Sequence, residues 1–143
     1  MQGCYEKIRP VDISEILPLL PAVNFVNTGG TNGWVARPDW LADFIASLQP
    51  EGRVTFMCLR KLPPYQNIPP HIDSWENIPN LGIRYHVPLL THPDVKMRWP
   101  DDGVEVHLEA GWLWSVNFKK LHEVVHLAPV ERIHLHYNVV PHD

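Results

Sequence analysis

Residues 132–140 read RIHLHYNVV and carry the clearest strand signal in the chain. Polar and apolar side chains alternate with a period of two, the pattern of a β-strand. One face carries Arg132, His134, His136 and Asn138, and the other carries Ile133, Leu135, Tyr137 and Val139. The polar face has two interpretations. It is either the solvated side of a half-exposed strand or the lining of a small barrel, where a buried Arg132 would need an anionic partner.

The same alternation occurs in Arg84-Tyr85-His86, where Arg84 and His86 would share a face. Other segments favour short strands because apolar residues recur between turn sequences. The expected strands span residues 54–59, 83–90, 95–99, 104–108, 112–116, 124–127 and 132–140, and residues 62–70 form a proline-rich connector. Strands of this length and spacing are typical of a sandwich or barrel. We therefore predict a mainly β fold, an antiparallel jelly roll.

The first fifty residues favour helices. Asp12 and Glu15 form a capping-box pattern, which predicts a short helix through Ile16 that prolines then end. Residues 23–35 are rich in Asn and Gly, so we expect a loop or loose hairpin. A second helix is predicted after Pro38, with an apolar face of Trp40, Leu41, Phe44, Ile45 and Leu48. These two short helices would pack on one side of the jelly roll.

Composition favours one soluble domain over residues 1–143, with a helical part at 1–50 and a jelly-roll core at 53–140. The net charge of -4, without a basic run, argues against nucleic-acid binding. No apolar stretch approaches the ~20 residues that span a bilayer, so no membrane is expected as a partner. The N-terminus lacks a signal-peptide pattern, and Cys4 and Cys58 are isolated thiols. We therefore expect a cytoplasmic protein.

His71-Ile72-Asp73 is a His-x-Asp triplet, and His122 is a candidate third metal ligand. In an extended segment, residues i and i+2 point to the same face, so His71 and Asp73 can aim at one point. Two imidazoles and one carboxylate on one side of an iron leave coordination positions open, as in non-haem Fe(II) oxygenases. Arg132 follows His122 by ten residues. Its guanidinium would bind an acidic co-substrate, because it pairs with a carboxylate bidentately.

Several motifs in order resemble the aspartyl/asparaginyl β-hydroxylase family, over about residues 53–140. They are Pro69-Pro70-His71-Ile72-Asp73, Arg84-Tyr85-His86-Val87-Pro88-Leu89, Thr91-His92-Pro93-Asp94-Val95, Ala110-Gly111-Trp112, Asn117, His122-Glu123-Val124 and Arg132-Ile133-His134-Leu135. The resemblance implies a double-stranded β-helix of cupin-like type. It also implies an Fe(II)- and 2-oxoglutarate-dependent dioxygenase, a hydroxylase that uses O2.

The resemblance also implies roles for single residues. The iron ligands would be His71, Asp73 and His122, and Arg132 would bind the distal carboxylate of 2-oxoglutarate; these four form the expected catalytic set. Arg84 and His86 match positions that contact the co-substrate or an acidic substrate. The candidate substrate-binding residues are Trp75, two residues beyond Asp73, His134, which shares a strand face with Arg132, and Asn117.

Three positions depart from the family pattern. Tyr65 replaces a glycine usual in the loop before the first histidine, Asn117 replaces a common aspartate, and Gly82 replaces an arginine of the vertebrate enzyme. The substrate class stays open between a peptide residue, a free amino acid and a lipid, and the oligomeric state stays open too. The alternative function is a non-catalytic metal-binding cupin-like module, acting as a sensor or structural partner. Such a module would need the metal ligands but not Arg132.

Overall fold

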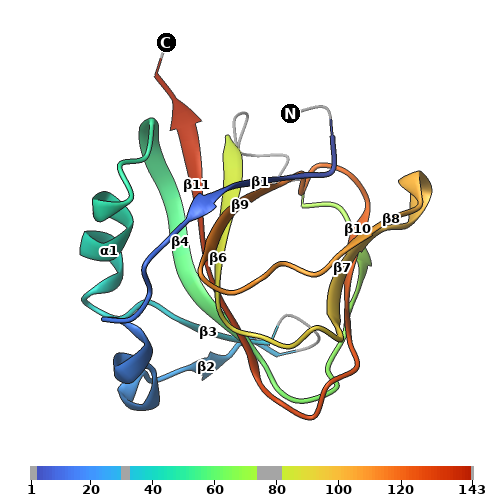
Figure 1. Cartoon of the computed structure of the whole chain (residues 1–143), viewed down its shortest axis with the longest axis horizontal. Coiled ribbons are helices and arrows are strands. Elements are labelled where there is room, and N and C mark those ends of the chain that lie inside the picture. Colours follow the sequence, from blue (N-terminus) through green and yellow to red (C-terminus); the bar gives the residue numbers. More distant parts are fainter. Residues whose placement is uncertain (1–2, 30–32, 74–81, 143) are drawn as a thin grey trace.

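Two antiparallel β-sheets form most of the protein (Figure 1). The computed structural model describes residues 3–29, 33–73 and 82–142. Within these residues, the large sheet has the order β1 (Tyr5–Pro10), β9 (Trp112–Val116), β6 (Ile83–Leu90), β11 (Arg132–Pro141), β4 (Gly52–Leu62), β3 (Trp34–Ala36) and β2 (Val26–Asn27). The small sheet has the order β5 (Ile68–His71), β10 (His122–His126), β7 (Val95–Trp99) and β8 (Val104–Val106). This architecture confirms the predicted mainly β, cupin-like jelly roll.

Strand β11 lies at the centre of the large sheet, paired with β4 on one side and β6 on the other. Every side chain from Arg132 to Val139 is buried. The apolar face packs into the main hydrophobic core, which includes Leu135 and Tyr137. The polar face is turned to the interior between the sheets, where Arg132 and His136 line a cavity. Of the two interpretations of the polar face, the inner lining is therefore the one that the fold adopts.

Helix α1 (Leu41–Ser47) packs on one side of the large sheet, beside β4 (Figure 1). Leu41 and Ile45 are each only 1% exposed and share the main core with Leu59 of β4. Burying one such side chain stabilises a fold by roughly 1.5–3 kcal/mol, so this helix is held by packing. The helices do lie on one side, as predicted. None in the described part of the chain has the length and apolar character of a membrane-spanning segment.

The first predicted helix begins later than the sequence pattern indicates, because residues 14–16 form a turn. The Oδ1 atom of Asp12 accepts a hydrogen bond from the backbone N–H of Ser14 at 3.0 Å. The carboxylate therefore closes a turn instead of capping an α-helix. A 3₁₀ helix follows at Leu17–Ala22 and contains two prolines. Proline has no backbone N–H to donate, which is why a short 3₁₀ segment forms here and no long α-helix.

The sequence pattern does not reveal two edge strands, β1 and β5. All six side chains of β1 are exposed, so no alternation of apolar residues marks it. β5 lies in the segment interpreted as a connector, because Pro69 and Pro70 are unusual in a strand. Proline is tolerated on an edge strand, where its missing N–H faces away from the sheet. β10 also begins earlier than predicted, so that His122 is its first residue.

Candidate metal centre

His71, Asp73 and His122 come together at the edge of the small sheet. His71 ends β5, His122 begins β10, and the two residues are directly paired across the sheet. Asp73 lies two residues beyond β5, where its backbone N–H donates to the carbonyl of Phe118 at 3.0 Å. The candidate ligand atoms of the three side chains all lie within 4.8 Å of one another. The strand pairing thus brings together the two histidines predicted to hold iron, and the segment after β5 places Asp73 beside them.

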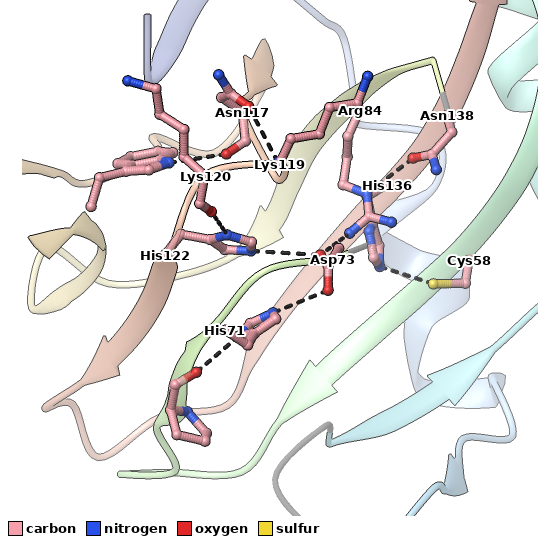
Figure 2. Close-up of polar contacts among 12 residues, drawn as sticks. Cys58, His71, Asp73, Arg84, Asn117, Lys119, Lys120, His122, His136 and Asn138 are labelled. Carbon is pink, nitrogen blue, oxygen red and sulfur yellow. Dashed lines mark hydrogen bonds and ion pairs between the residues drawn. The ribbon is translucent and has the colours of Figure 1, made fainter. Parts of the chain in front are cut away.

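Both histidines are oriented by backbone carbonyls. Nδ1 of His71 lies 2.8 Å from the carbonyl oxygen of Pro69, and Nδ1 of His122 lies 2.7 Å from that of Lys120 (Figure 2). A carbonyl only accepts, so each Nδ1 carries the hydrogen, and each neutral ring has its lone pair on Nε2. Such a bond from the second ring nitrogen is the usual support of a metal-ligating histidine.

The two Nε2 atoms face the same carboxylate. Nε2 of His71 lies 3.3 Å from Oδ1 of Asp73, and Nε2 of His122 lies 3.5 Å from Oδ2. When both rings are neutral, every atom that meets here is an acceptor, so either a cation or extra protons must lie between them. The donor set of two imidazoles and one carboxylate suits a divalent transition metal. The residues present therefore fit an Fe(II) ion.

The side chain of Asp73 is kept in its ionised form. Burial raises the pKa of this carboxyl, but the contacts with the rings of His122 and His71 and the charge of Arg84 outweigh burial, so the pKa lies well below its ordinary value. The hydrogen bond to Asp73 raises the pKa of His71 above its ordinary value, although burial opposes it. The carboxylate is thus ionised and available to a metal over the whole neutral range.

Arg84, on β6 of the large sheet, binds the carboxylate of the candidate metal centre. Its Nη1 donates to Oδ2 of Asp73 at 2.8 Å, and its Nε donates to Oδ1 of Asn138 at 3.0 Å (Figure 2). The guanidinium carbon also lies 4.5 Å from the ring centre of Phe118. We predicted Arg84 as a contact of the co-substrate or substrate. The structure places it in the cavity and assigns two of its nitrogens to Asp73 and Asn138.

A cavity of about 190 Å³ connects the candidate metal ligands with the large sheet. Its apolar lining consists of Phe56, Ile68, Met97, Val116, Phe118 and Val124. Its polar lining consists of Arg60, His71, Asp73, Arg84, His86, His122, Arg132 and His136. Among the described residues that line it, Asp73 is the only carboxylate, whereas three are arginines. The cavity is therefore suited to an anionic ligand beside the metal.

Arg132 is buried in the wall of this cavity, with an exposed fraction of 3%. Its Nε has no hydrogen-bond partner in the described part of the chain. Burial lowers the pKa of Arg132 to about 9, and the nearby charge of Arg60 contributes in the same direction. A buried guanidinium without a carboxylate is costly, so its position favours an anion supplied by a ligand.

His86 and His134 form a buried pair. Their Nδ1 atoms lie 3.0 Å apart, so one ring donates to the other. Burial and the charge of Arg132 lower the pKa of both rings well below the ordinary value, and both are neutral. His86, which we predicted to contact the co-substrate or substrate, lines the main cavity. His134, predicted to bind substrate, instead lines a small adjoining cavity that it shares with Arg132 and Thr91.

Asn117, another predicted substrate-binding residue, is not among the residues that line the cavity. The side-chain amide of Asn117 donates to the carbonyl of Gly3 at 3.0 Å, and its Oδ1 accepts from the backbone N–H of Lys119 at 3.2 Å. Asn117 therefore joins the N-terminal segment to the turn before β10. Trp75 lies outside the described residues.

Two of the departures from the family pattern have local explanations. Gly82 has a φ of +72°, and a Cβ there would lie 2.1 Å from the carbonyl oxygen of Val139. An arginine does not fit at this position without moving β11. Tyr65 has a φ of +63°, the left-handed conformation that favours glycine. The backbone that a glycine adopts easily is therefore retained here with a tyrosine.

Sequence reasoning missed Arg60, His136 and Cys58 as residues of the site. Arg60 of β4 pairs directly with His134, and Cys58 pairs with His136. The alternation of Cys58, Arg60 and Leu62 along β4 is visible in the sequence. What the sequence lacks is the register between β4 and β11, which determines which side chains meet.

Two solved structures share the fold of this chain. The chain is similar in structure to the viral collagen prolyl hydroxylase vCPH from Paramecium bursaria Chlorella virus-1, solved with 2OG, with a TM-score of 0.70, 13% identity and coverage of 95% of both chains. A Pseudomonas putida prolyl-4-hydroxylase gives a TM-score of 0.69 at 14% identity, covering 99% of this chain and 95% of that one.

At such identities these two likenesses show the fold alone. A comparison with curated proteins gives no significant match. The family model described as aspartyl/asparaginyl beta-hydroxylase matches residues 41–141, which include all three candidate metal ligands and Arg132. With most of its length matched, the chain belongs to the aspartyl/asparaginyl β-hydroxylase family.

Proposed function

We propose that the protein is an Fe(II)- and 2-oxoglutarate-dependent hydroxylase. It would insert one oxygen atom from O2 into an unactivated C–H bond and release succinate and CO2. One observation carries this proposal. Arg132, a buried arginine to which the described residues offer no carboxylate partner, lines the same cavity as a cluster of two histidines and one aspartate. A metal-binding module that did no oxygenase chemistry would have no use for that arginine. The viral prolyl hydroxylase of similar fold, solved with 2OG, supports the choice of co-substrate.

The residues divide the work between the two sheets. His71, Asp73 and His122 would hold the iron, which when bound couples the decarboxylation of 2-oxoglutarate to the activation of O2. Arg132 would bind the distal carboxylate of 2-oxoglutarate and fix its orientation. Arg84 keeps the Asp73 carboxylate ionised and directed at the histidines. His122 and Arg132, each 3% exposed, lie where the sheets exclude bulk water.

We infer that the substrate is an aspartyl/asparaginyl-type residue or a related amino acid. The family match and the cationic lining by Arg60 and Arg84 support this substrate class. The partner would be a small-molecule amino acid or a peptide, met in the cytoplasm. Nucleic acid and membrane are not expected as partners, since the net charge is -4.

A binding experiment tests the proposal directly. Protein with Fe(II) and 2-oxoglutarate, kept free of O2, should show the visible charge-transfer absorption of the chelated 2-oxo acid. Arg132→Ala should weaken 2-oxoglutarate binding by more than about tenfold, because a hydrogen-bonded charge pair is lost. Arg53→Ala is the matched control, since Arg53 is an exposed arginine of the neighbouring strand β4.

Turnover is tested by succinate release, screened over free amino acids and acidic or amidated peptides. Release that depends on both Fe(II) and a particular substrate would identify the substrate class. Iron binding with no spectral effect of 2-oxoglutarate would contradict the proposal and favour the non-catalytic cupin-like module.

A further inference from the structure

A thiol and an imidazole are in contact at the wall of the cavity. Cys58 of β4 and His136 of β11 are direct cross-strand partners, with Sγ 2.9 Å from Nε2 (Figure 2). Cys58 has no exposed surface, and His136 is 4% exposed. Neither residue is among the candidate metal ligands. His136 is nevertheless one of the residues that line the cavity, whereas Cys58 lies behind it.

The thiol determines which ring nitrogen of His136 carries hydrogen. Burial raises the pKa of Cys58, so the sulfur keeps its proton and is a donor. Burial, with the nearby charges of Arg84 and Arg60, lowers the pKa of His136 well below the ordinary value, so the ring is neutral. A thiol that donates to Nε2 leaves the ring hydrogen on Nδ1. The Nδ1 atom is buried and has no hydrogen-bond partner among the described residues.

The described neighbours of His136 leave its Nδ1 without a hydrogen-bond acceptor. On the inward face of β11, His136 is followed by Asn138, which binds Arg84. On its other side the inward residues are His134 and then Arg132. Inward residues of one strand succeed each other by about 7 Å, so His136 stands between the metal centre and Arg132. The ring of His86 lies 5.0 Å away, centre to centre. The described lining of the cavity contains three arginines and one carboxylate, so donors outnumber acceptors. The Nδ1–H of His136 therefore needs a ligand that carries several hydrogen-bond acceptors.

We propose that His136, fixed in its Nδ1–H form by Cys58, donates a hydrogen bond to a carboxylate oxygen of the 2-oxo acid whose distal end Arg132 binds. This inference rests on the proposed function. Cys58 is then a positioning residue, because it acts only through the imidazole. The pair would supply a neutral donor between two cationic ones, which orients the ligand without adding charge to the cavity.

The test compares two replacements of one side chain. His136→Leu removes the ring and every donor, whereas His136→Asn keeps an amide N–H near the position of Nδ1. The affinity of the Fe(II) protein for 2-oxoglutarate is titrated without O2 by its charge-transfer absorption. His136→Leu should weaken binding about tenfold, as expected for a lost hydrogen bond to a charged group, and His136→Asn should recover most of that loss.

The Cys58 variants separate positioning from packing. Cys58→Ser keeps an O–H donor and should bind 2-oxoglutarate as the unchanged protein does. Cys58→Ala should weaken binding about threefold, because the ring no longer has a partner that fixes its tautomer. Thermal unfolding and Fe(II) affinity, measured on all four variants, identify any loss that comes from the fold or the metal centre.

Nitrogen-15 NMR of the histidine rings reads the tautomer of His136 without any ligand. Hydrogen on Nδ1 in the unchanged protein and in Cys58→Ser, with a mixture in Cys58→Ala, supports the inference. Hydrogen on Nε2 overturns it, as does equal 2-oxoglutarate affinity in His136→Leu and the unchanged protein, or equal loss in His136→Leu and His136→Asn. A complete lack of 2-oxoglutarate binding by the unchanged Fe(II) protein would instead contradict the proposed function itself.

Discussion

The two ends of the cavity need partners of opposite charge: the described residues would bind a cation at one end and an anion at the other. At the small sheet, two imidazole lone pairs and the Asp73 carboxylate are acceptors that converge without a cation of their own. At the large sheet, Arg132 is a buried donor that the described chain does not provide with a carboxylate. A metal cation would complete the first end and a dicarboxylate would complete the second. A single ligand that reached from the metal to the arginine would answer both requirements, as the proposed function expects.

The largest expected effect comes from removing the charge at the metal end. Asp73→Asn keeps the shape of the side chain but loses the anionic ligand and the ion pair with Arg84. Fe(II) affinity should fall by more than about 100-fold, since even groups that only support metal ligands are worth 10–100-fold. Anaerobic calorimetric titration with Fe(II) measures the change.

Glu123→Gln is the matched control for Asp73→Asn. Glu123 follows His122 directly, but its carboxylate lies 3.5 Å from Arg98 in a surface ion pair, away from the cavity. Its removal should leave Fe(II) affinity within about twofold, as surface pairs contribute little. Equal losses in the two variants would contradict the assignment of Asp73 as the ligand.

Removing the charge of Arg132, at the other end of the cavity, should make the metal-free protein more stable. Arg132→Met keeps much of the length of the side chain and removes a buried guanidinium to which the described part of the chain offers no carboxylate. Without metal or 2-oxoglutarate, the free energy of unfolding in urea should rise by about 1–3 kcal/mol, while 2-oxoglutarate binding is lost. Arg53→Met, on an exposed position of β4, should change stability little. Destabilisation of the Arg132 variant would show that the folded chain itself satisfies this arginine.

The pH dependence of metal binding tests the metal end of the cavity without a mutation. The ring of His71 must lose its proton to bind a metal, and the hydrogen bond to Asp73 raises its pKa. Fe(II) affinity should therefore fall as the pH drops through that raised pKa, by about tenfold per pH unit for one proton. Mn(II) titration between about pH 8 and about pH 6 measures the slope, and Asp73 stays ionised throughout because its pKa is lowered.

The same raised pKa acts on the metal-free fold with the opposite sign. A histidine whose pKa is raised on folding contributes stability that is fully present below its unfolded pKa. That contribution is lost as the pH rises through the folded pKa. Alkaline pH thus weakens this part of the metal-free protein while it strengthens metal binding. Metal affinity that does not change over this range would contradict the coordination of His71.

The strands and the site were predictable to different degrees. The period of two in residues 132–140 and 83–90 predicts β11 and β6 because each buries one apolar face in the core. β1 escapes the same reasoning because both of its faces are exposed. Patterns of side chains report burial, so an edge strand whose side chains are all exposed leaves little trace in the sequence.

Within the site, the residue types indicated the chemistry but not the contacts. His71, Asp73, His122 and Arg132 could be selected because a facial triad and a carboxylate-binding arginine require those side chains. That Arg84 pairs with Asp73, and that Cys58 meets His136, depends on the registers of β4, β6 and β11. Those registers are set by the packing of the whole large sheet, which no local pattern contains.

The smallest expected effect lies at Asn138, where the two ends of the cavity are joined. Its Oδ1 accepts from Nε of Arg84, which in turn holds Asp73. Asn138→Ala removes one of two fixed contacts of Arg84, so the guanidinium keeps its ion pair but gains freedom. Fe(II) affinity should fall only about threefold, as for the loss of one net hydrogen bond at a distance from the metal. Titration beside Asp73→Asn checks this, since an equal loss in both would mean that Arg84, and not the carboxylate itself, controls the metal centre.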